Sequence, residues 1–94
     1  MAHDPSIIFF CDGLEASELA SFAQRLETLG YDALWVPEFF GREPFSTVSF
    51  VLANTERLRV ATGIANVYAR DAIVAAQARQ TLAELSGGRF ILGL

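Results

Sequence analysis

The stretch of residues 58–94 reads LRVATGIANVYARDAIVAAQARQTLAELSGGRFILGL and decides the fold. It opens with an apolar, β-branched run over residues 58–64, which predicts a buried strand. After the segment 65–70, Asp71 can cap an alanine-rich helix that extends to Leu85 and ends at Ser86-Gly87-Gly88. The apolar run over residues 90–94 predicts a further strand. The stretch is therefore a strand–helix–strand unit.

Two units of the same kind precede this stretch. The apolar run over residues 6–11 predicts a strand, and the helical spacing of apolar residues over 14–29, closed by Gly30, predicts a helix. Residues 33–37 predict the second strand, which ends at Pro37 because proline cannot donate to a sheet ladder. Pro44 marks the first turn of a helix that runs to about residue 55.

The predicted order is β-α-β-α-β-α-β, with strand starts about 25 to 32 residues apart, which is typical of crossovers in a parallel sheet. Both a doubly wound sheet and a (β/α)8 barrel have this rhythm, and a barrel needs roughly 250 residues. The 94 residues would make close to half a barrel. Their hydrophobic fraction of 52% is also high for so short a chain. We expect either a truncated N-terminal piece or two copies that complete one another.

Composition excludes several classes of function. The formal net charge of −4, without a cluster of Lys or Arg, argues against a nucleic-acid partner. One cysteine and one histidine cannot form an ordinary structural zinc site or a disulfide framework, so no metal is expected. No signal peptide is apparent and no apolar run approaches the roughly 18 residues of a membrane span. We expect a cytoplasmic protein with no membrane partner.

Glu38 is the candidate catalytic residue, because ligands of parallel α/β folds bind at the carboxyl ends of the strands. It follows the second strand directly and precedes Phe39 and Phe40, where partial desolvation would raise the pKa of its carboxyl group. A salt bridge to Arg42 or a cap for the next helix is the structural alternative.

Asn66, Tyr68 and Arg70 follow the third strand and offer donors for a polar ring or a phosphate. Alternatively, Arg70 pairs with Asp71 or Glu38, and Asn66 holds a turn. Cys11, at the end of the first strand, is expected to be a small buried thiol. No nucleophilic triad or nucleotide loop is apparent, so an enzyme built this way would depend on a cofactor for its chemistry.

Three blocks of the sequence resemble the luciferase-like monooxygenase superfamily of flavin and deazaflavin oxidoreductases. They are LGYDALWVPE at 29–38, TERLRVATGIANVYARD at 55–71 and LAELSGGRFILGL at 82–94. The Ser-Gly-Gly-Arg turn after an alanine-rich helix is the most specific of these features. The first 28 residues match only in pattern, and Ala72 stands where relatives often have proline.

The resemblance implies that residues 1–94 are the N-terminal half of a (β/α)8 barrel, truncated from a longer oxidoreductase. It implies a cofactor ring at the carboxyl mouth, with Glu38 as the acidic residue after the second strand. A non-prolyl cis peptide at Gly63-Ile64, or at Ile64-Ala65, would back the ring, and Asn66 and Arg70 would border it. Gly63, Ile64, Ala65, Asn66 and Arg70 are therefore the expected cofactor-binding residues.

The ending FILGL resembles the branch of the superfamily that uses the deazaflavin coenzyme F-420, with FMN as the alternative cofactor. The resemblance implies hydride transfer to or from a small-molecule substrate, or monooxygenation with FMN, and a homo-oligomer. The 94 residues alone should be inactive, because the family builds its phosphate site from later strands. A non-catalytic half-barrel that self-associates is the alternative function, and an unrelated phosphosugar-type barrel enzyme is a third possibility.

Overall fold

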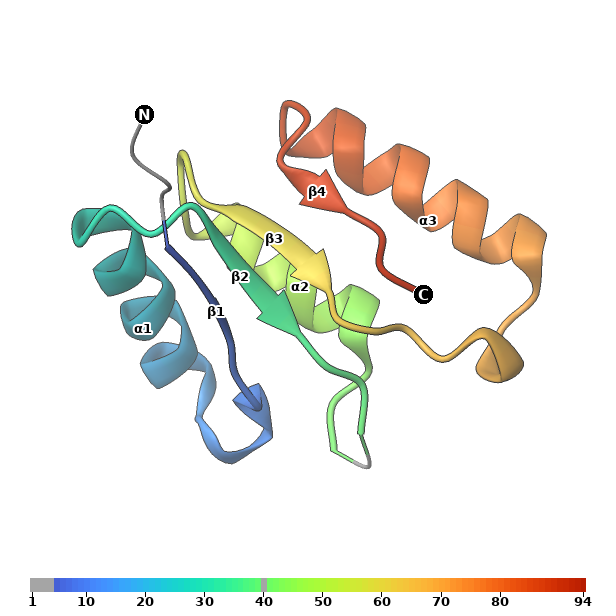
Figure 1. The fold of residues 1–94 in the computed structure, drawn as a ribbon, viewed down its shortest axis with the longest axis horizontal. Coiled ribbons are helices and arrows are strands. Elements are labelled where there is room, and N and C mark those ends of the chain that lie inside the picture. Colours follow the sequence, from blue (N-terminus) through green and yellow to red (C-terminus); the bar gives the residue numbers. More distant parts are fainter. Residues whose placement is uncertain (1–4, 40) are drawn as a thin grey trace.

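The computed structural model describes residues 5–39 and 41–94 and contains the predicted alternation of strands and helices (Figure 1). Two short 3-10 turns, η1 and η2, interrupt the alternation. The elements in chain order are β1 (Ser6–Ile8), η1 (Cys11–Gly13), α1 (Ala16–Thr28), β2 (Ala33–Val36), α2 (Pro44–Ala53), β3 (Arg59–Thr62), η2 (Val67–Ala69), α3 (Ala72–Leu85) and β4 (Phe90–Ile91).

The four strands form one parallel sheet in the order β1-β2-β3-β4. Each strand lies next to the strand that follows it in sequence, so every new strand is added at the same edge of the sheet. In a doubly wound sheet the strand order turns back and later strands are added at the other edge, whereas a barrel adds all its strands at one edge. The strand order therefore selects the barrel type of winding that the sequence left open, and the chain is α/β.

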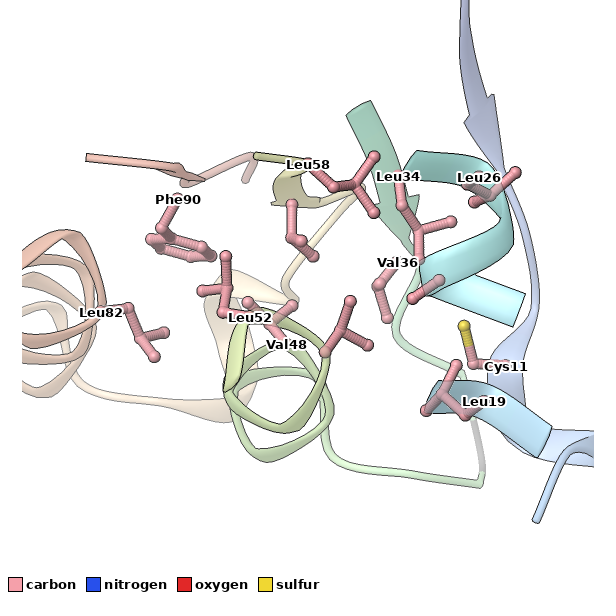
Figure 2. Close-up of a cluster of buried hydrophobic side chains, with 13 residues drawn as sticks. Cys11, Leu19, Leu26, Leu34, Val36, Val48, Leu52, Leu58, Leu82 and Phe90 are labelled. Atoms are coloured by element: carbon pink, nitrogen blue, oxygen red, sulfur yellow. The ribbon is translucent and has the colours of Figure 1, made fainter. Parts of the chain in front are cut away.

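One face of the sheet carries the hydrophobic core. The register aligns Ile7, Leu34, Val60 and Phe90 in one row across the four strands. Figure 2 shows this face packed against the helices, and the buried cluster includes residues of all three helices together with Leu34, Val60 and Phe90. All three helices therefore cover the same face, as the outer helices of a barrel do.

The opposite face of the sheet has no covering layer in the part of the chain that the structure describes. The adjacent row of the register aligns Ile8, Trp35, Ala61 and Ile91, and these residues lie outside the core cluster. Ile8 is 62% exposed. This face corresponds to the interior of a barrel, and its apolar residues contribute to the high hydrophobic fraction of the sequence.

The helix ends follow the capping signals in the sequence. Asp71 accepts a hydrogen bond from the Ile73 N–H (2.8 Å), as expected of the cap of α3. The helix ends at a turn in which Gly87 and Gly88 have φ angles of +67° and +85°, a region that favours glycine. The start of α1 differs from the prediction, because Glu15 and Glu18 form a reciprocal capping box and the helix begins at Ala16.

The first and last strands are shorter than predicted. The ladder of β1 ends at Ile8, and the chain then turns through η1 at Cys11–Gly13, where the buried Cys11 joins the core. The ladder of β4 ends at Ile91, although residues 90–94 are all apolar or glycine. Beyond it, Thr62 holds the main chain of Gly93 through its side-chain hydroxyl, so the segment stays beside β3 without a regular ladder.

Arg89 secures the amino end of the sheet. Its guanidinium donates to the carbonyl oxygens of Leu52 (2.9 Å), Leu58 (3.0 Å) and Thr55 (3.2 Å), and to the Thr55 hydroxyl (3.0 Å). The acceptors at Leu52 and Thr55 belong to the last turn of α2 and the residues after it, where carbonyl groups lack partners within the helix. The arginine of the Ser-Gly-Gly-Arg turn thus joins α2 to the starts of β3 and β4.

Candidate functional site

The candidate site lies at the carboxyl ends of β2 and β3, where main-chain hydrogen bonds tie the two exits together. The Gly63 N–H donates to the Val36 carbonyl (2.8 Å), and the Glu38 N–H donates to the Ile64 carbonyl (3.3 Å). The Ala65 N–H then donates to the Gly93 carbonyl (2.8 Å), which brings in the chain after β4. Glu38 is therefore held beside the segment 63–66 by the backbone, before any side-chain contact is considered.

The segment after β3 has the cis peptide bond that was expected there. It lies between Gly63 and Ile64, the first of the two positions predicted. Ile64 is more than half exposed, whereas Ala65 is buried. Trp35 packs against Gly63, where an added Cβ would lie 3.1 Å from the indole ring. Among Gly63, Ile64 and Ala65, Ile64 is therefore the residue whose side chain is exposed.

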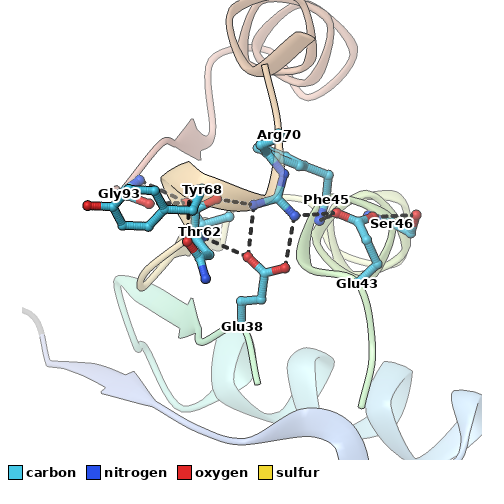
Figure 3. A network of polar contacts seen from close by, with 9 residues as sticks. Glu38, Glu43, Phe45, Ser46, Thr62, Tyr68, Arg70 and Gly93 are labelled. Atoms are coloured by element: carbon cyan, nitrogen blue, oxygen red, sulfur yellow. Dashed lines mark hydrogen bonds and ion pairs between the residues drawn. The ribbon is translucent and has the colours of Figure 1, made fainter. Parts of the chain in front are cut away.

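Arg70 forms a two-point ion pair with Glu38, which Figure 3 shows at close range. The Arg70 Nη1 donates to Glu38 Oε1 (2.8 Å) and Nη2 donates to Oε2 (2.9 Å). The Asn66 N–H also donates to Oε1 (2.7 Å). The Glu38 and Arg70 side chains are 17% and 12% exposed, so the pair is mostly shielded from water. Such a fork fixes the plane of the carboxylate.

The ion pair shifts the pKa of Glu38 in the direction opposite to the one predicted. Desolvation was expected to raise the pKa of its carboxyl group, and that expectation is wrong. The hydrogen bond from Arg70 lowers the pKa of Glu38, partial burial opposes this, and the Asn66 N–H lowers it further. The same hydrogen bond raises the pKa of Arg70. Glu38 is consequently a fixed carboxylate that accepts hydrogen bonds, rather than a group poised to exchange a proton near neutral pH.

Arg70 has three further partners around its guanidinium. Nη1 donates to the Asn66 carbonyl (3.0 Å), and Nη2 lies 3.5 Å from Glu43 Oε2. The guanidinium carbon lies 5.1 Å from the centre of the Phe45 ring, within the range of a cation–π contact. The structural alternative for Arg70, a pairing with Glu38, is therefore confirmed as a contact, while Asp71 caps α3 instead.

The structural alternatives for Glu38 and Asn66 have different outcomes. Arg42 does not form the suggested pair with Glu38, because it donates to the carbonyl groups of Cys11 and Leu14. Glu43, not Glu38, caps the next helix by accepting from the Ser46 N–H (2.9 Å). The Asn66 side chain does hold a turn, since its Oδ1 accepts from the Tyr68 N–H (2.9 Å) at the start of η2.

A hollow of about 390 Å³ opens beside the ion pair. Its lining combines a carboxylate and an amide with apolar and aromatic side chains, and consists of Glu38, Ile64, Asn66, Val67, Tyr68 and Leu94. Tyr68 is 96% exposed. The hollow unites Glu38, Ile64 and Asn66 of the predicted site, whereas Gly63, Ala65 and Arg70 are not among the residues that line it.

Sequence patterns missed two contributors to this site. Glu43 brings a second carboxylate to Arg70, and its place just before Pro44, at a helix start, is the signal that could have located it. Leu94 reaches the hollow from beyond β4, and only the parallel order of β3 and β4 places it there. Among residues 5–39 and 41–94, no cluster of three or more His, Cys, Asp or Glu residues could hold a metal ion. No helix within these ranges is long and apolar enough to span a membrane.

Comparison with known proteins places these features in a family. The family model for luciferase-like monooxygenases matches residues 7–94. A 5,10-methylenetetrahydromethanopterin reductase of Methanolobus tindarius is 36% identical over 78 residues, which is 82% of this chain and 24% of that protein. The chain thus spans about a quarter of the length of the curated relatives it matches.

Solved structures of low identity share the fold. A coenzyme F420 dependent tetrahydromethanopterin reductase from Methanopyrus kandleri aligns with a TM-score of 0.86 and 22% identity, over 95% of this chain and 26% of that one. The oxygenating constituent of 3,6-diketocamphane monooxygenase from Pseudomonas putida, in complex with FMN, aligns with a TM-score of 0.83 and 16% identity. That alignment covers 98% of this chain and 29% of that one.

Proposed function

We propose, because this chain belongs to the luciferase-like monooxygenase family, that it supplies the first half of a (β/α)8 barrel oxidoreductase. The hollow beside Glu38 and Arg70 would be part of the cofactor and substrate site. The observation that carries the proposal is the convergence of a fixed carboxylate, an exposed Ile64 and an open hollow at the carboxyl ends of the strands, where barrel enzymes bind ligands.

The residues of the hollow fit the ring of a deazaflavin or flavin. Small-molecule sites commonly have volumes of roughly 300–1,000 Å³ and apolar walls with a few polar groups. The hollow, at about 390 Å³, offers Ile64, Val67 and Leu94 as apolar surface and Glu38 as an acceptor. When bound, such a ring supplies hydride transfer or, for FMN, oxygen activation. Glu38 would orient a polar edge of the ring or of the substrate.

The anionic tail of either cofactor finds no free partner in this hollow. Arg70 was the predicted anion fork, yet its guanidinium is shared between two carboxylates, Glu38 and Glu43. We infer that Arg70 holds Glu38 beside the ring of the cofactor, and that the phosphate groups are bound by parts of the barrel outside residues 1–94. The 94 residues alone would then bind cofactor weakly and be inactive.

The deazaflavin coenzyme F-420 is the proposed cofactor, and FMN is the alternative. The ending FILGL of the sequence favours the deazaflavin, and the curated relative from Methanolobus tindarius, a methylenetetrahydromethanopterin reductase, is consistent with hydride transfer. We expect the substrate to be a small molecule, the protein to be cytoplasmic, and the complete barrels to associate as homo-oligomers.

Titration of the natural full-length protein with F-420 and with FMN tests the proposal. The absorbance and fluorescence of each cofactor report binding directly. We expect saturable binding of one of them, with F-420 the tighter, and much weaker binding to a protein limited to residues 1–94. A full-length protein that binds neither cofactor would refute the assignment as an oxidoreductase of this class.

A self-associating half-barrel is the second candidate, and the uncovered sheet face favours it. On that face Ile8 is 62% exposed and Trp35 and Ile91 are half-buried, and a second copy would cover them in place of the other half of a barrel. Sedimentation of residues 1–94 separates the two candidates. A well-folded dimer supports self-association, whereas an unfolded monomer counts against it.

A further inference from the structure

The hydrogen-bonding capacity of the Arg70 terminal nitrogens is fully used within the protein. Nη1 and Nη2 carry four N–H donors, and four acceptors surround them. Nη1 binds Glu38 Oε1 and the Asn66 carbonyl, while Nη2 binds Glu38 Oε2 and lies 3.5 Å from Glu43 Oε2. The guanidinium carbon also lies over the Phe45 ring, 5.1 Å from its centre. The terminal nitrogens of Arg70 are therefore committed to partners within the protein rather than offered to a ligand.

The charges around Arg70 also disfavour an anion at this position. One guanidinium faces two carboxylates, Glu38 and Glu43, so the cluster carries a formal net charge of −1. An added phosphate or carboxylate would meet this negative charge at short range and would have to displace an ion pair that already has good two-point geometry. A neutral ligand edge with N–H or O–H donors faces no such penalty.

The acceptor capacity of Glu38 is used unequally by its two oxygens. Each carboxylate oxygen can accept about two hydrogen bonds. Oε1 accepts from Arg70 Nη1 (2.8 Å) and from the Asn66 N–H (2.7 Å), so it is saturated. Oε2 accepts from Arg70 Nη2 (2.9 Å) and keeps capacity for one more donor. Because Glu38 lines the hollow, a ligand donor is the natural partner for Oε2.

We propose that Arg70 is a positioning residue, which holds Glu38 so that Oε2 accepts a hydrogen bond from an N–H or O–H group of the ligand. This inference rests on the proposed function, since the ligand is the cofactor ring or substrate of that site. Without the fork, Glu38 would rotate among its rotamers and lose binding energy when a ligand fixed it. The fork also keeps the pKa of Glu38 low, so that the group stays an acceptor.

The test compares Arg70→Met with Arg59→Met in the natural full-length protein. Arg59 also forms an ion pair with a carboxylate, Asp32. It is the first residue of β3, however, whereas the hollow lies beyond the carboxyl end of that strand. Both substitutions remove one arginine: Arg70→Met removes the ion pairs with Glu38 and Glu43, and Arg59→Met removes the ion pair with Asp32. Two quantities are measured: the Glu38 carboxyl titration by carbon-13 NMR without cofactor, assigned with Glu38→Gln, and the affinity for F-420 and FMN.

For Arg70→Met, the Glu38 titration should move to higher pH, and the affinity for whichever cofactor the wild type binds should fall about tenfold or more. Arg59→Met should change neither quantity. An affinity that remains as in the wild type would overturn the positioning role, whether or not the Glu38 titration moves. If Arg70→Met does not fold, Arg70→Lys replaces it. Lysine keeps the charge without the fork, so the titration should stay low while the affinity falls.

The two arms separate this inference from the proposed function. If the wild type binds neither F-420 nor FMN, the proposed function fails. The NMR measurement still shows whether Arg70 lowers the pH at which the Glu38 carboxyl group titrates. If the wild type binds a cofactor but Arg70→Met binds it equally well, the proposed function stands and the positioning role is refuted.

Discussion

Replacement of Gly93 by alanine should disrupt the carboxyl end of β3, where the candidate site begins. A Cβ at residue 93 would lie 2.1 Å from the Thr62 carbonyl oxygen. This is about 1 Å closer than the shortest ordinary carbon–oxygen contacts, which are roughly 3.3 Å. The obstructing atom belongs to the backbone, so no side-chain rotation relieves the contact. The segment after β4 would have to move away from β3.

The expected cost follows from what that movement breaks. Thr62 Oγ1 donates to the Gly93 carbonyl (2.8 Å) and accepts from the Gly93 N–H (2.9 Å), and the Ala65 N–H donates to the same carbonyl (2.8 Å). Each lost hydrogen bond lowers the free energy of unfolding by a net value of about 1 kcal/mol, and overpacking lowers it by about a further 1–3 kcal/mol. Partial relaxation offsets some of this sum. We expect Gly93→Ala to lower the free energy of unfolding by about 3 kcal/mol.

Gly13→Ala is the matched control, because a Cβ at Gly13 would meet no atom within 4 Å and its φ is not positive. It should be neutral or stabilise by less than about 1 kcal/mol through the unfolded state. Urea denaturation of the natural full-length protein and both variants, followed by circular dichroism, gives the comparison. Equal unfolding midpoints for Gly93→Ala and Gly13→Ala would refute the close approach of Gly93 to β3.

Three further predictions concern individual side chains. Glu38→Gln should weaken cofactor binding about tenfold or more. Arg70 would remain hydrogen-bonded to the amide oxygen, so the amide N–H2 group would face the donor of the ligand, where Glu38 has an acceptor. An unchanged affinity in a titration would contradict this. Partial burial alone would raise the pKa of the Glu27 carboxyl group, but hydrogen bonds from the backbone N–H groups of residues 56–58 lower it below its ordinary value. Glu27→Gln should therefore lower the free energy of unfolding by about 1 kcal/mol at pH 7. The folded pKa lies below the unfolded one, so this loss should vanish as the pH falls well below 4.5, and urea melts at both pH values check the sign. Burial raises the pKa of Cys11 to about 11 against the opposing effect of Arg42, so the folded protein should resist thiol labelling at pH 8 while the unfolded protein reacts; rapid labelling of the folded state would count against a buried thiol.

Local sequence signals predicted the elements because each lies within a few residues of the structure that it controls. Asp71 caps α3 two residues away, and Gly87 and Gly88 turn the chain directly after it. The ends of β1 and β4 were not predictable in this way. Their ladders stop where a non-local contact takes over, at the buried Cys11 in one case and at the Thr62 hydroxyl in the other.

The position of Glu38 was predictable, but its electrostatics were not. Its place after β2 follows from the apolar run and Pro37, which are local features. The sign of its pKa shift depends on Arg70, which lies 32 residues later and reaches Glu38 through the parallel pairing of β2 and β3. The flanking Phe39 and Phe40 suggested desolvation, whereas the hydrogen bond from Arg70, at the exit of the next strand, dominates the pKa shift of Glu38. The second carboxylate at Arg70, from Glu43, was missed for the same reason.

The location of the ligand is the central claim, and a crystal structure of the natural full-length protein with F-420, or with FMN, tests it most directly. We predict that the ring lies against Ile64 in the hollow of about 390 Å³, with a donor of the ring or of a co-bound substrate within hydrogen-bond distance of Glu38 Oε2. The Glu38–Arg70 pair should remain intact in the complex. A ring bound away from Ile64, or a cofactor phosphate seated on Arg70 in place of Glu38, would contradict the account.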